Sequence, residues 1–448
     1  MPITEAIAER KKTKTASLTD LIISRLKKVQ PKASAECSYD VTHSSKIILS
    51  DVNYVLTTGI RAFDDLSGGL PFGRVVELFG LESCGKTAMA IRCAIRAKQG
   101  HVYKRIRNDD KTVTLERVDP DSYHMAVLYV DNEQSLDSSR KIMVDGTELD
   151  VVLTRCDTVE LLFKEIDELI KTCEAYKEET GKEVFVVVVV DTIAGTSSKE
   201  ELAQAWDKDD YPRQPKQLSQ GFRTMINDIS RHNVCMICTN QVRTNFAGAN
   251  MQKNKTIVPQ HTEFSTFGGK ALSFYSSHRV FMHGFTSKYT LIKGAQFAAG
   301  FLVGFYILKN RLKKPKREGR MVLLFDEEGQ GGLHDVLSLL ETFIFLGFAE
   351  YDEGTKQIVF KFRKNGIPTT TFQDITPSLE EQDSQPLRGR KAYKDPRIDE
   401  KAEWPGFYLE HKPDLDALWD ASVKYAMTIE GMDGKVVEAS GMDETEED

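Results

Sequence analysis

The eight residues that begin at Gly80 constrain the fold of this 448-residue chain more than any other stretch. They fit the pattern G-x-x-x-x-G-K-[ST], which forms phosphate-binding loops between a strand and a helix. The residues before the pattern, Arg74 to Phe79, are mostly apolar and predict a buried strand, whereas residues 88–95 after it favour a helix. A chance glycine-rich turn would not require both flanks. The pattern comprises Gly80, Leu81, Glu82, Ser83, Cys84, Gly85, Lys86 and Thr87.

Each part of this loop has a chemical reason. Gly80 and Gly85 allow the backbone to turn its amides inward, because glycine tolerates positive φ. Such amides, together with a helix N-terminus, make a cradle for anions. Lys86 would then neutralise the outer phosphates of a nucleotide, and the Thr87 hydroxyl would bind Mg²⁺. The loop therefore predicts ATP and Mg²⁺ as cofactors.

Strands and helices alternate after the loop. Residues 126–133, 184–190 and 234–239 read as buried strands, and residues 159–176 and 216–231 have the apolar spacing of helices. A long run of β-branched apolar residues is typical of a central parallel strand that is covered on both faces. We therefore expect an α/β fold whose mostly parallel sheet has helices on both sides.

Polar residues of the right types follow several of these strands. Lys86, Glu133, Asp191 and Gln241 lie at or just beyond predicted carboxyl ends, where sites gather in parallel sheets. Asp191 would hold Mg²⁺ through water opposite Thr87, and Glu133 would activate the water that attacks the γ-phosphate. Gln241 could sense the γ-phosphate and pass the signal to the loop behind it. Alternatively, Asp191 only caps a strand and Glu133 is a surface carboxylate.

Two irregular segments, Ser197 to Pro215 and Val242 to Thr266, follow the strands that end near Asp191 and Gln241. Loops of this length are usually functional or disordered. Arg243 lies in the second segment, and Lys216 and Arg223 lie seven residues apart on the next helix, roughly on one face. These side chains suit a phosphodiester backbone. The alternative is a solvated helix face next to a disordered loop.

Positive charge is local in this chain. The net charge is −7, so nucleic acid could bind only through local basic patches. The run from Lys309 to Arg317 has six basic residues in nine. It could supply cations to nucleic acid or to the ATP of a neighbouring subunit, or it could be a solvated turn. Residues 443–448 are mostly acidic and read as a solvated tail.

The length of the chain is enough for two or three domains. We expect residues 1–50 to hold a helix and a linker used in oligomerisation, 51–330 the ATPase core, and 331–448 a smaller α+β domain with the acidic tail. Residues 101–124 are highly charged and predict a surface insertion that forms a hairpin. No signal peptide or membrane span is evident, and the unpaired cysteines suit a reducing compartment, so we expect a cytoplasmic protein without a membrane partner.

Over about residues 50–350 the chain resembles RecA-type recombinases, including the phage UvsX type. The phosphate loop is similar to that family's G-P-E-S-S-G-K-T, with Leu81 and Cys84 in place of proline and serine. The other matching segments are Thr57-Thr58-Gly59, Gly69 to Glu77, Val130 to Asp137, Ser219 to Arg223, Asn240 to Arg243, Gly268 to Tyr275 and Lys309-Asn310-Arg311.

The resemblance implies roles around the nucleotide. Glu133 would be the catalytic glutamate, and Asp137 would contact the adenine. Arg140 stands where the family has an adenine-stacking tyrosine, and a guanidinium can also stack. Lys309 and Arg311 match two lysines that reach the ATP of the neighbouring subunit; arginine keeps the second charge.

The resemblance also implies partners: single-stranded and double-stranded DNA, further copies of the chain in a helical filament, and single-strand-binding and loader proteins. The two irregular segments would be DNA-binding loops. A RecA-fold hexameric helicase or other ring motor, and a non-catalytic DNA-binding relative, are the alternatives. The implied DNA-binding residues are Lys216, Ser219, Arg223, Arg243, Gly268, Gly269 and Lys270.

Overall fold

The computed structural model describes much of the chain between residues 52 and 360 and a few positions beyond. The chain divides into two compact units, Met1–Asn53 and Tyr54–Asp448, and almost every described residue belongs to the second. The helix expected at the N-terminus lies outside the described residues. Described are 52–108, 112–134, 136, 143–144, 147–148, 151–202, 214–244, 264–289, 300–325, 331–346, 349–352, 357–360, 408–409, 412–413, 416 and 419–420.

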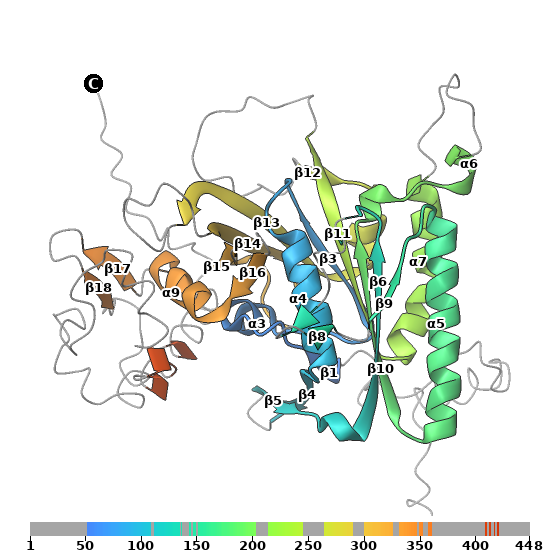
Figure 1. Cartoon of the computed structure of the whole chain (residues 1–448), viewed down its shortest axis with the longest axis horizontal. Helices are drawn as coiled ribbons and strands as arrows, with labels where there is room; N and C mark the ends of the chain where they lie inside the picture. The colour runs from blue at the N-terminus through green and yellow to red at the C-terminus, as the bar shows by residue number, and fades with distance from the viewer. Residues whose placement is uncertain are drawn as a thin grey trace, which may run out of the picture. The chain divides into compact units, whose positions relative to one another are not determined.

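A ten-stranded sheet forms the centre of this unit (Figure 1). In spatial order its strands are β16 (Gly331–His334), β15 (Arg317–Phe325), β14 (Gly300–Lys309), β13 (Ser276–Tyr289), β3 (Arg74–Gly80), β11 (Val234–Thr244), β10 (Glu183–Asp191), β6 (Tyr123–Asp131) and β9 (Val152–Thr154), and β12 (Phe264–Thr266) pairs with β11. The pairings from β13 to β9 are parallel, and those from β13 to β16 are antiparallel. The predicted mostly parallel sheet is therefore confirmed.

Helices cover both faces of the parallel strands. Figure 1 shows α4 (Lys86–Lys98) on one side, and α5 (Val159–Thr180) and α7 (Gln214–Arg231) on the other. Side chains of β10 alternate between two hydrophobic clusters: Val187 and Val189 pack with α4, whereas Val186, Val188 and Val190 pack with α5 and α7. All five valines are fully buried. Burial on both faces explains why this strand is apolar without interruption.

The charged insertion forms a hairpin, as the sequence predicted. β4 (Val102–Arg107) pairs antiparallel with β5 (Val113–Arg117), and β4 also pairs with β1 (Tyr54–Leu56). With β2 (Leu70–Pro71), next to β1, these strands make a separate four-stranded sheet. A 3₁₀ turn at Pro120–Ser122 then leads into β6.

The region after residue 331 begins with a strand, although the sequence from Leu333 to Phe345 predicts a helix. Leu333 and His334 belong to strand β16, which pairs with β15, and helix α9 (Asp335–Phe345) starts one residue later. The His334 ring accepts a hydrogen bond from the Leu337 amide at 3.3 Å, so His334 is the N-cap of α9 and does not belong to the helix itself. The sequence also predicts a strand at Ile358 to Phe362, and β18 (Gln357–Phe360) lies there and pairs with β17 (Ala349–Asp352). The domain boundary at 331 stays a prediction.

Residues near the C-terminus pack against α3 (Arg61–Ser67). The Trp419 side chain is fully buried, its indole Nε1 donates to Asp65 Oδ2 at 2.6 Å, and its ring meets that of Phe343 edge-on at 5.2 Å. Arg61 forms ion pairs with Asp416 and Asp420. A segment remote in sequence therefore completes the packing of an early helix. The sequence predicts a last helix at Leu415 to Ile429, and most of that range lies outside the described residues.

The remaining elements are short. They are β7 (Met143–Val144), β8 (Thr147–Glu148), the 3₁₀ turn η4 (Ile193–Gly195), α6 (Lys199–Leu202) and α8 (Ala271–Tyr275).

No helix among the described residues is both long and apolar enough to cross a membrane.

Candidate active site

The glycine-rich segment forms a turn between strand β3 and helix α4. Gly80 is the last residue of the strand, and Gly85 precedes the helix with φ 81°. A Cβ atom on Gly80 would lie 2.0 Å from the Met282 carbonyl oxygen, so no larger residue fits there. Ser83 also has a positive φ of 56°. The local structure therefore has the strand–turn–helix form that the motif requires.

The ammonium of Lys86 lies inside this turn. Its Nζ donates to the Leu81 carbonyl oxygen at 2.5 Å and to the Gly80 carbonyl oxygen at 3.3 Å. The Cys84 sulfur is 3.6 Å away, and burial raises the pKa of this thiol, which keeps it neutral. The loop thus concentrates one positive charge where its amides would hold a phosphate.

The Asp191 carboxylate lies at the end of β10 and is almost fully buried. Tyr129 donates its hydroxyl to Oδ2 at 2.9 Å, and Thr239 donates to Oδ1 at 2.5 Å. Tyr129 and the β10 valines next to it belong to the cluster that α4 covers, so this carboxylate lies on the same side of the sheet as α4, which carries Thr87 in its first turn.

Glu133 and Gln241 meet above the end of β10. Gln241 Nε2 donates to Glu133 Oε1 at 3.1 Å, and the Glu133 amide donates to the Asp191 carbonyl oxygen at 3.2 Å. Partial loss of contact with water and the nearby Asp191 carboxylate raise the pKa of Glu133, whereas the Gln241 hydrogen bond and Lys86 lower it. The structure thus brings together Lys86, Glu133, Asp191 and Gln241. Their chemical roles stay predictions.

A buried ionic network lies beneath Gln241 and was not predicted. Glu77 on β3 is fully buried, accepts from Asn240 Nδ2 at 3.0 Å and pairs with Arg279 Nε at 2.5 Å. Asn240 Nδ2 also donates to the Phe267 carbonyl oxygen at 3.0 Å, and Phe267 directly follows β12, the strand that pairs with the end of β11. A charged residue inside an otherwise apolar strand was the one sequence signal for this network. The sequence reasoning likewise missed Tyr129 and Thr239.

Several predicted DNA-binding residues lie near one another. Lys216 and Arg223 are exposed on α7, and Ser219 is half-buried between them. The turn at Gly268 and Gly269 packs on the start of this helix. A Cβ on Gly268 would come 2.4 Å from Leu218 Cδ1, and one on Gly269 would come 3.3 Å from Pro215 Cβ. The turn therefore needs glycine to lie this close to α7.

One further predicted residue lies next to this group, and others lie outside the described residues. Lys270 directly follows the glycine turn and is exposed. Arg243 belongs to strand β11, but its side chain lies outside the described residues. Asp137 and Arg140 also lie outside the described residues. The same holds for most of the two irregular segments that were predicted to be DNA-binding loops: residues 203–213 of the segment Ser197 to Pro215, and residues 245–263 of the segment Val242 to Thr266.

Lys309 and Arg311 are not brought to the phosphate loop of their own chain. Lys309 donates to the Ser273 and Phe274 carbonyl oxygens at 3.0 and 3.1 Å, at the end of α8. Residues of α8 belong to the cluster formed with α5 and α7, on the opposite face from α4. Burial and the nearby Arg311 lower the pKa of Lys309. Arg311 is exposed.

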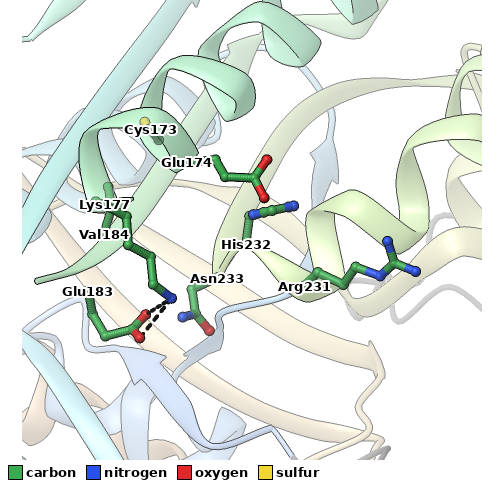
Figure 2. Close-up of a pocket in the computed structure, with 8 residues that line it drawn as sticks. All are labelled: Cys173, Glu174, Lys177, Glu183, Val184, Arg231, His232 and Asn233. Atoms are coloured by element: carbon green, nitrogen blue, oxygen red, sulfur yellow. Dashed lines mark hydrogen bonds and ion pairs between the residues drawn. The ribbon is translucent and has the colours of Figure 1, made fainter. Parts of the chain in front are cut away.

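A small pocket lies between the C-terminal ends of α5 and α7 (Figure 2). An ion pair between Lys177 and Glu183, with an N–O distance of 2.8 Å, closes one side of it. It lies at the amino ends of β10 and β11, opposite the ends that carry the site, so it is not part of that site. Its lining residues are Cys173, Glu174, Lys177, Glu183, Val184, Arg231, His232 and Asn233.

The residues at the strand ends fit a magnesium ion that is bound mainly by phosphate and water. Mg²⁺ with nucleotides usually takes only one or two protein oxygens. Thr87 supplies a hydroxyl, and Asp191 supplies a carboxylate whose oxygens each keep lone pairs beyond the hydrogen bonds they accept. Within the described residues there is no cluster of three or more histidine, cysteine, aspartate or glutamate side chains that could hold a metal on its own.

Comparison with known proteins gives a consistent family match. The profile of the RecA N-terminal domain matches residues 107–330, which is half of the chain. The matched part begins after the phosphate-binding loop and includes Glu133, Asp191 and Gln241.

Individual relatives are similar at modest identity. The chain is 29% identical to Protein RecA of Chlamydia trachomatis over 262 residues, 58% of this chain and 61% of that protein. It is 29% identical to Protein RecA of Thermus aquaticus over 285 residues, 63% of this chain and 68% of that protein. It is also 29% identical over 274 residues to the mitochondrial DNA repair protein recA homolog 3 of Arabidopsis thaliana, 60% of this chain and 53% of that protein. The match to the chlamydial proteins thus covers less than two thirds of their length.

Proposed function

Since this chain belongs to the RecA family, we propose that it is an ATP-dependent DNA recombinase. It would assemble on single-stranded DNA as a filament, pair that strand with homologous double-stranded DNA and promote strand exchange in recombination and repair. The observation that carries this proposal is the convergence of Lys86, Glu133, Asp191 and Gln241 at neighbouring strand ends.

ATP hydrolysis would use these side chains in distinct roles. When bound, Mg²⁺ would supply positive charge that compensates the negative charge developing on the phosphates. The loop amides and Lys86 would hold the phosphates, Thr87 and Asp191 would hold the ion, and Glu133 would orient and deprotonate the attacking water. Asp137 and Arg140 would contact the base.

Gln241 is suited to report on the nucleotide. It touches Glu133, while Asn240 beside it bonds to Phe267, on the far side of the loop 245–263. A γ-phosphate that competes for the Gln241 amide would change the position of both ends of this loop. DNA would then bind tightly with ATP and loosen after hydrolysis.

Lys309 and Arg311 would act on a neighbouring subunit. Because Lys309 lies on the face opposite α4, it is separated from its own phosphate loop by the sheet. A head-to-tail assembly, which generates helical filaments, would bring these cations to the ATP of the next copy. The N-terminal residues 1–50 would pack on that copy.

DNA would bind along the start of α7 and the turn beside it. Exposed cations there suit phosphates, and the tightly packed glycines would let backbone amides approach them. Single-strand-binding and loader proteins would act with it in the cytoplasm, which would be that of the host if a phage encodes it. The contacts would come from Lys216, Ser219, Arg223, Arg243, Gly268, Gly269 and Lys270.

The test is the ATPase rate of the full chain with and without single-stranded DNA, with the Lys86→Ala variant as the control for a contaminating enzyme. We expect DNA to stimulate hydrolysis and Lys86→Ala to abolish it. Electron microscopy with DNA and a slowly hydrolysed ATP analogue should show helical filaments. An ATPase rate that DNA does not change would reject the proposal. Closed rings that unwind forked DNA would favour a ring motor instead. No hydrolysis at all would favour a non-catalytic relative.

A further inference from the structure

Both oxygens of the Asp191 carboxylate are held by hydroxyl groups from the two strands that flank β10. Tyr129 comes from β6 and donates to Oδ2 at 2.9 Å, whereas Thr239 comes from β11 and donates to Oδ1 at 2.5 Å. The aspartate is 1% exposed, and both hydroxyl-bearing side chains are fully buried. A charge so far from water depends on these two donors for its compensation.

The two donors are themselves fixed. Tyr129 belongs to the hydrophobic cluster under α4, so its ring cannot turn without disturbing that packing. The Thr239 carbonyl oxygen accepts a hydrogen bond from Thr192 Oγ1 at 2.8 Å, which joins β11 to the residue directly after Asp191. The carboxylate plane is therefore set by β6 and β11 and not by β10 alone.

We propose that Tyr129 and Thr239 are positioning residues that fix the orientation of the Asp191 carboxylate and set how strongly the site binds its divalent cation. This inference rests on the proposed function, in which Asp191 holds the ion of Mg²⁺–ATP. Neither hydroxyl touches the nucleotide; both act through the carboxylate.

The direction of the effect follows from charge compensation. A hydroxyl that donates to a carboxylate takes part of its negative charge, which weakens the pull of that carboxylate on a cation or on water bound to the cation. Removal of one donor leaves a buried charge less compensated. A cation would then restore more of the lost compensation, so it should bind more tightly, while the less restrained carboxylate should support slower turnover.

The experiment compares Tyr129→Phe and Thr239→Val with the wild-type chain. The midpoint of Mg²⁺-dependent binding of a fluorescent ATP analogue is measured without DNA, and kcat is measured with DNA at saturating Mg²⁺. We expect each variant to lower the Mg²⁺ midpoint by about tenfold, the effect of one hydrogen bond to a charged group. We also expect a lower kcat. General damage to the fold would instead weaken cation binding.

Two further variants serve as matched controls. Tyr123 lies on the same strand, and none of the described residues bonds to its buried hydroxyl, so Tyr123→Phe makes the same chemical change away from Asp191 and should leave the midpoint unchanged. Thr239→Ser keeps the donor and should restore the wild-type midpoint. The Thr239 pair tests the inference even when Tyr129→Phe does not fold.

Three outcomes are distinguishable. A wild-type chain without Mg²⁺-dependent nucleotide binding would overturn the proposed function and this inference with it. Normal wild-type binding with an unchanged or raised midpoint in the folded variants would overturn this inference alone. A lowered midpoint in Thr239→Val that Thr239→Ser reverses would support it.

Discussion

Gln241 Nε2 donates to Glu133 Oε1 at 3.1 Å, although β10 separates the strands from which these residues come. The contact therefore spans the end of the strand that carries Asp191. It joins the side chain proposed to activate water to the side chain proposed to sense the γ-phosphate. Replacement of Gln241 and replacement of Glu133 should therefore have different effects on ATP hydrolysis and on DNA binding.

Loss of the Gln241 side-chain amide should uncouple DNA binding from ATP binding. In Gln241→Met the side chain keeps its size but cannot donate to Glu133 or to a phosphate. We expect ATP to bind with nearly wild-type affinity, while the increase in DNA affinity that ATP produces is lost. DNA binding by fluorescence anisotropy, with and without the ATP analogue, measures this. An undiminished nucleotide effect on DNA binding would exclude Gln241 as the sensor.

Loss of the Glu133 carboxylate should instead trap the protein in its complex with ATP and DNA. Glu133→Gln cannot deprotonate water, so hydrolysis should fall by roughly 10²- to 10⁴-fold, the usual contribution of a general base. ATP and DNA binding should persist, because the substitution changes neither the phosphate loop nor the residues proposed to bind DNA. The measurement is the lifetime of the DNA complex after ATP is added. A complex that dissociates as fast as the wild-type complex would argue against this role.

The pH dependence of hydrolysis should reflect the surroundings of Glu133. Its ordinary pKa is 4.5, and partial desolvation and Asp191 raise it. A base must be ionised, so activity should be lost, as pH falls, at a higher pH than an ordinary glutamate would give. The Gln241 hydrogen bond lowers this pKa, so Gln241→Met should move the acid limb of kcat to still higher pH. Identical acid limbs in the two proteins would contradict the assignment.

Mixing two inactive variants should restore activity if Lys309 acts on the next subunit. A Lys309→Ala subunit retains Glu133, and a Glu133→Gln subunit retains Lys309. In a mixed head-to-tail assembly, about a quarter of the interfaces would combine both intact residues. We expect the mixture to hydrolyse ATP faster than either variant alone at the same total concentration. Rates that merely average would place the function of Lys309 within its own subunit.

The contact between Trp419 and α3 should stabilise the compact unit. Trp419 is fully buried, so Trp419→Ala should lower the free energy of unfolding by about 3–5 kcal/mol, as is typical for a deleted core aromatic. Leu409 lies in the same segment but is 69% exposed, so Leu409→Ala should change it by less than about 0.5 kcal/mol. Chemical denaturation measures both. Equal effects would mean that Trp419 does not pack as described.

Much of the parallel half of the sheet was predictable from the sequence, for physical reasons. A strand buried on both faces has to be apolar throughout, so β10 is visible as a run of valines, and the polar residues at its end mark the carboxyl edge. Strand β13 begins with Ser276 and carries His278 and Arg279, so its hydrophobic pattern is interrupted and its place in the sheet was not predicted.

The cross-strand pairs could not be predicted, because a sequence does not specify which residues meet. Glu77 and Arg279 are 202 positions apart, and Tyr129 and Asp191 are 62 positions apart. Only the register between strands places each pair at bonding distance. The convergence of Lys86, Glu133 and Asp191 was predictable because all three share one edge, but the hydroxyls around Asp191 were not.

The indole of Trp419 donates to Asp65, which lies 354 positions earlier in the chain and is therefore translated first. During synthesis α3 leaves the ribosomal exit tunnel long before Trp419 is translated. The surface of α3 that Trp419 covers in the full-length chain therefore stays exposed while the sheet forms. Proteins shortened before this tryptophan would keep that face uncovered permanently. They should therefore depend more on chaperones than the full-length chain does.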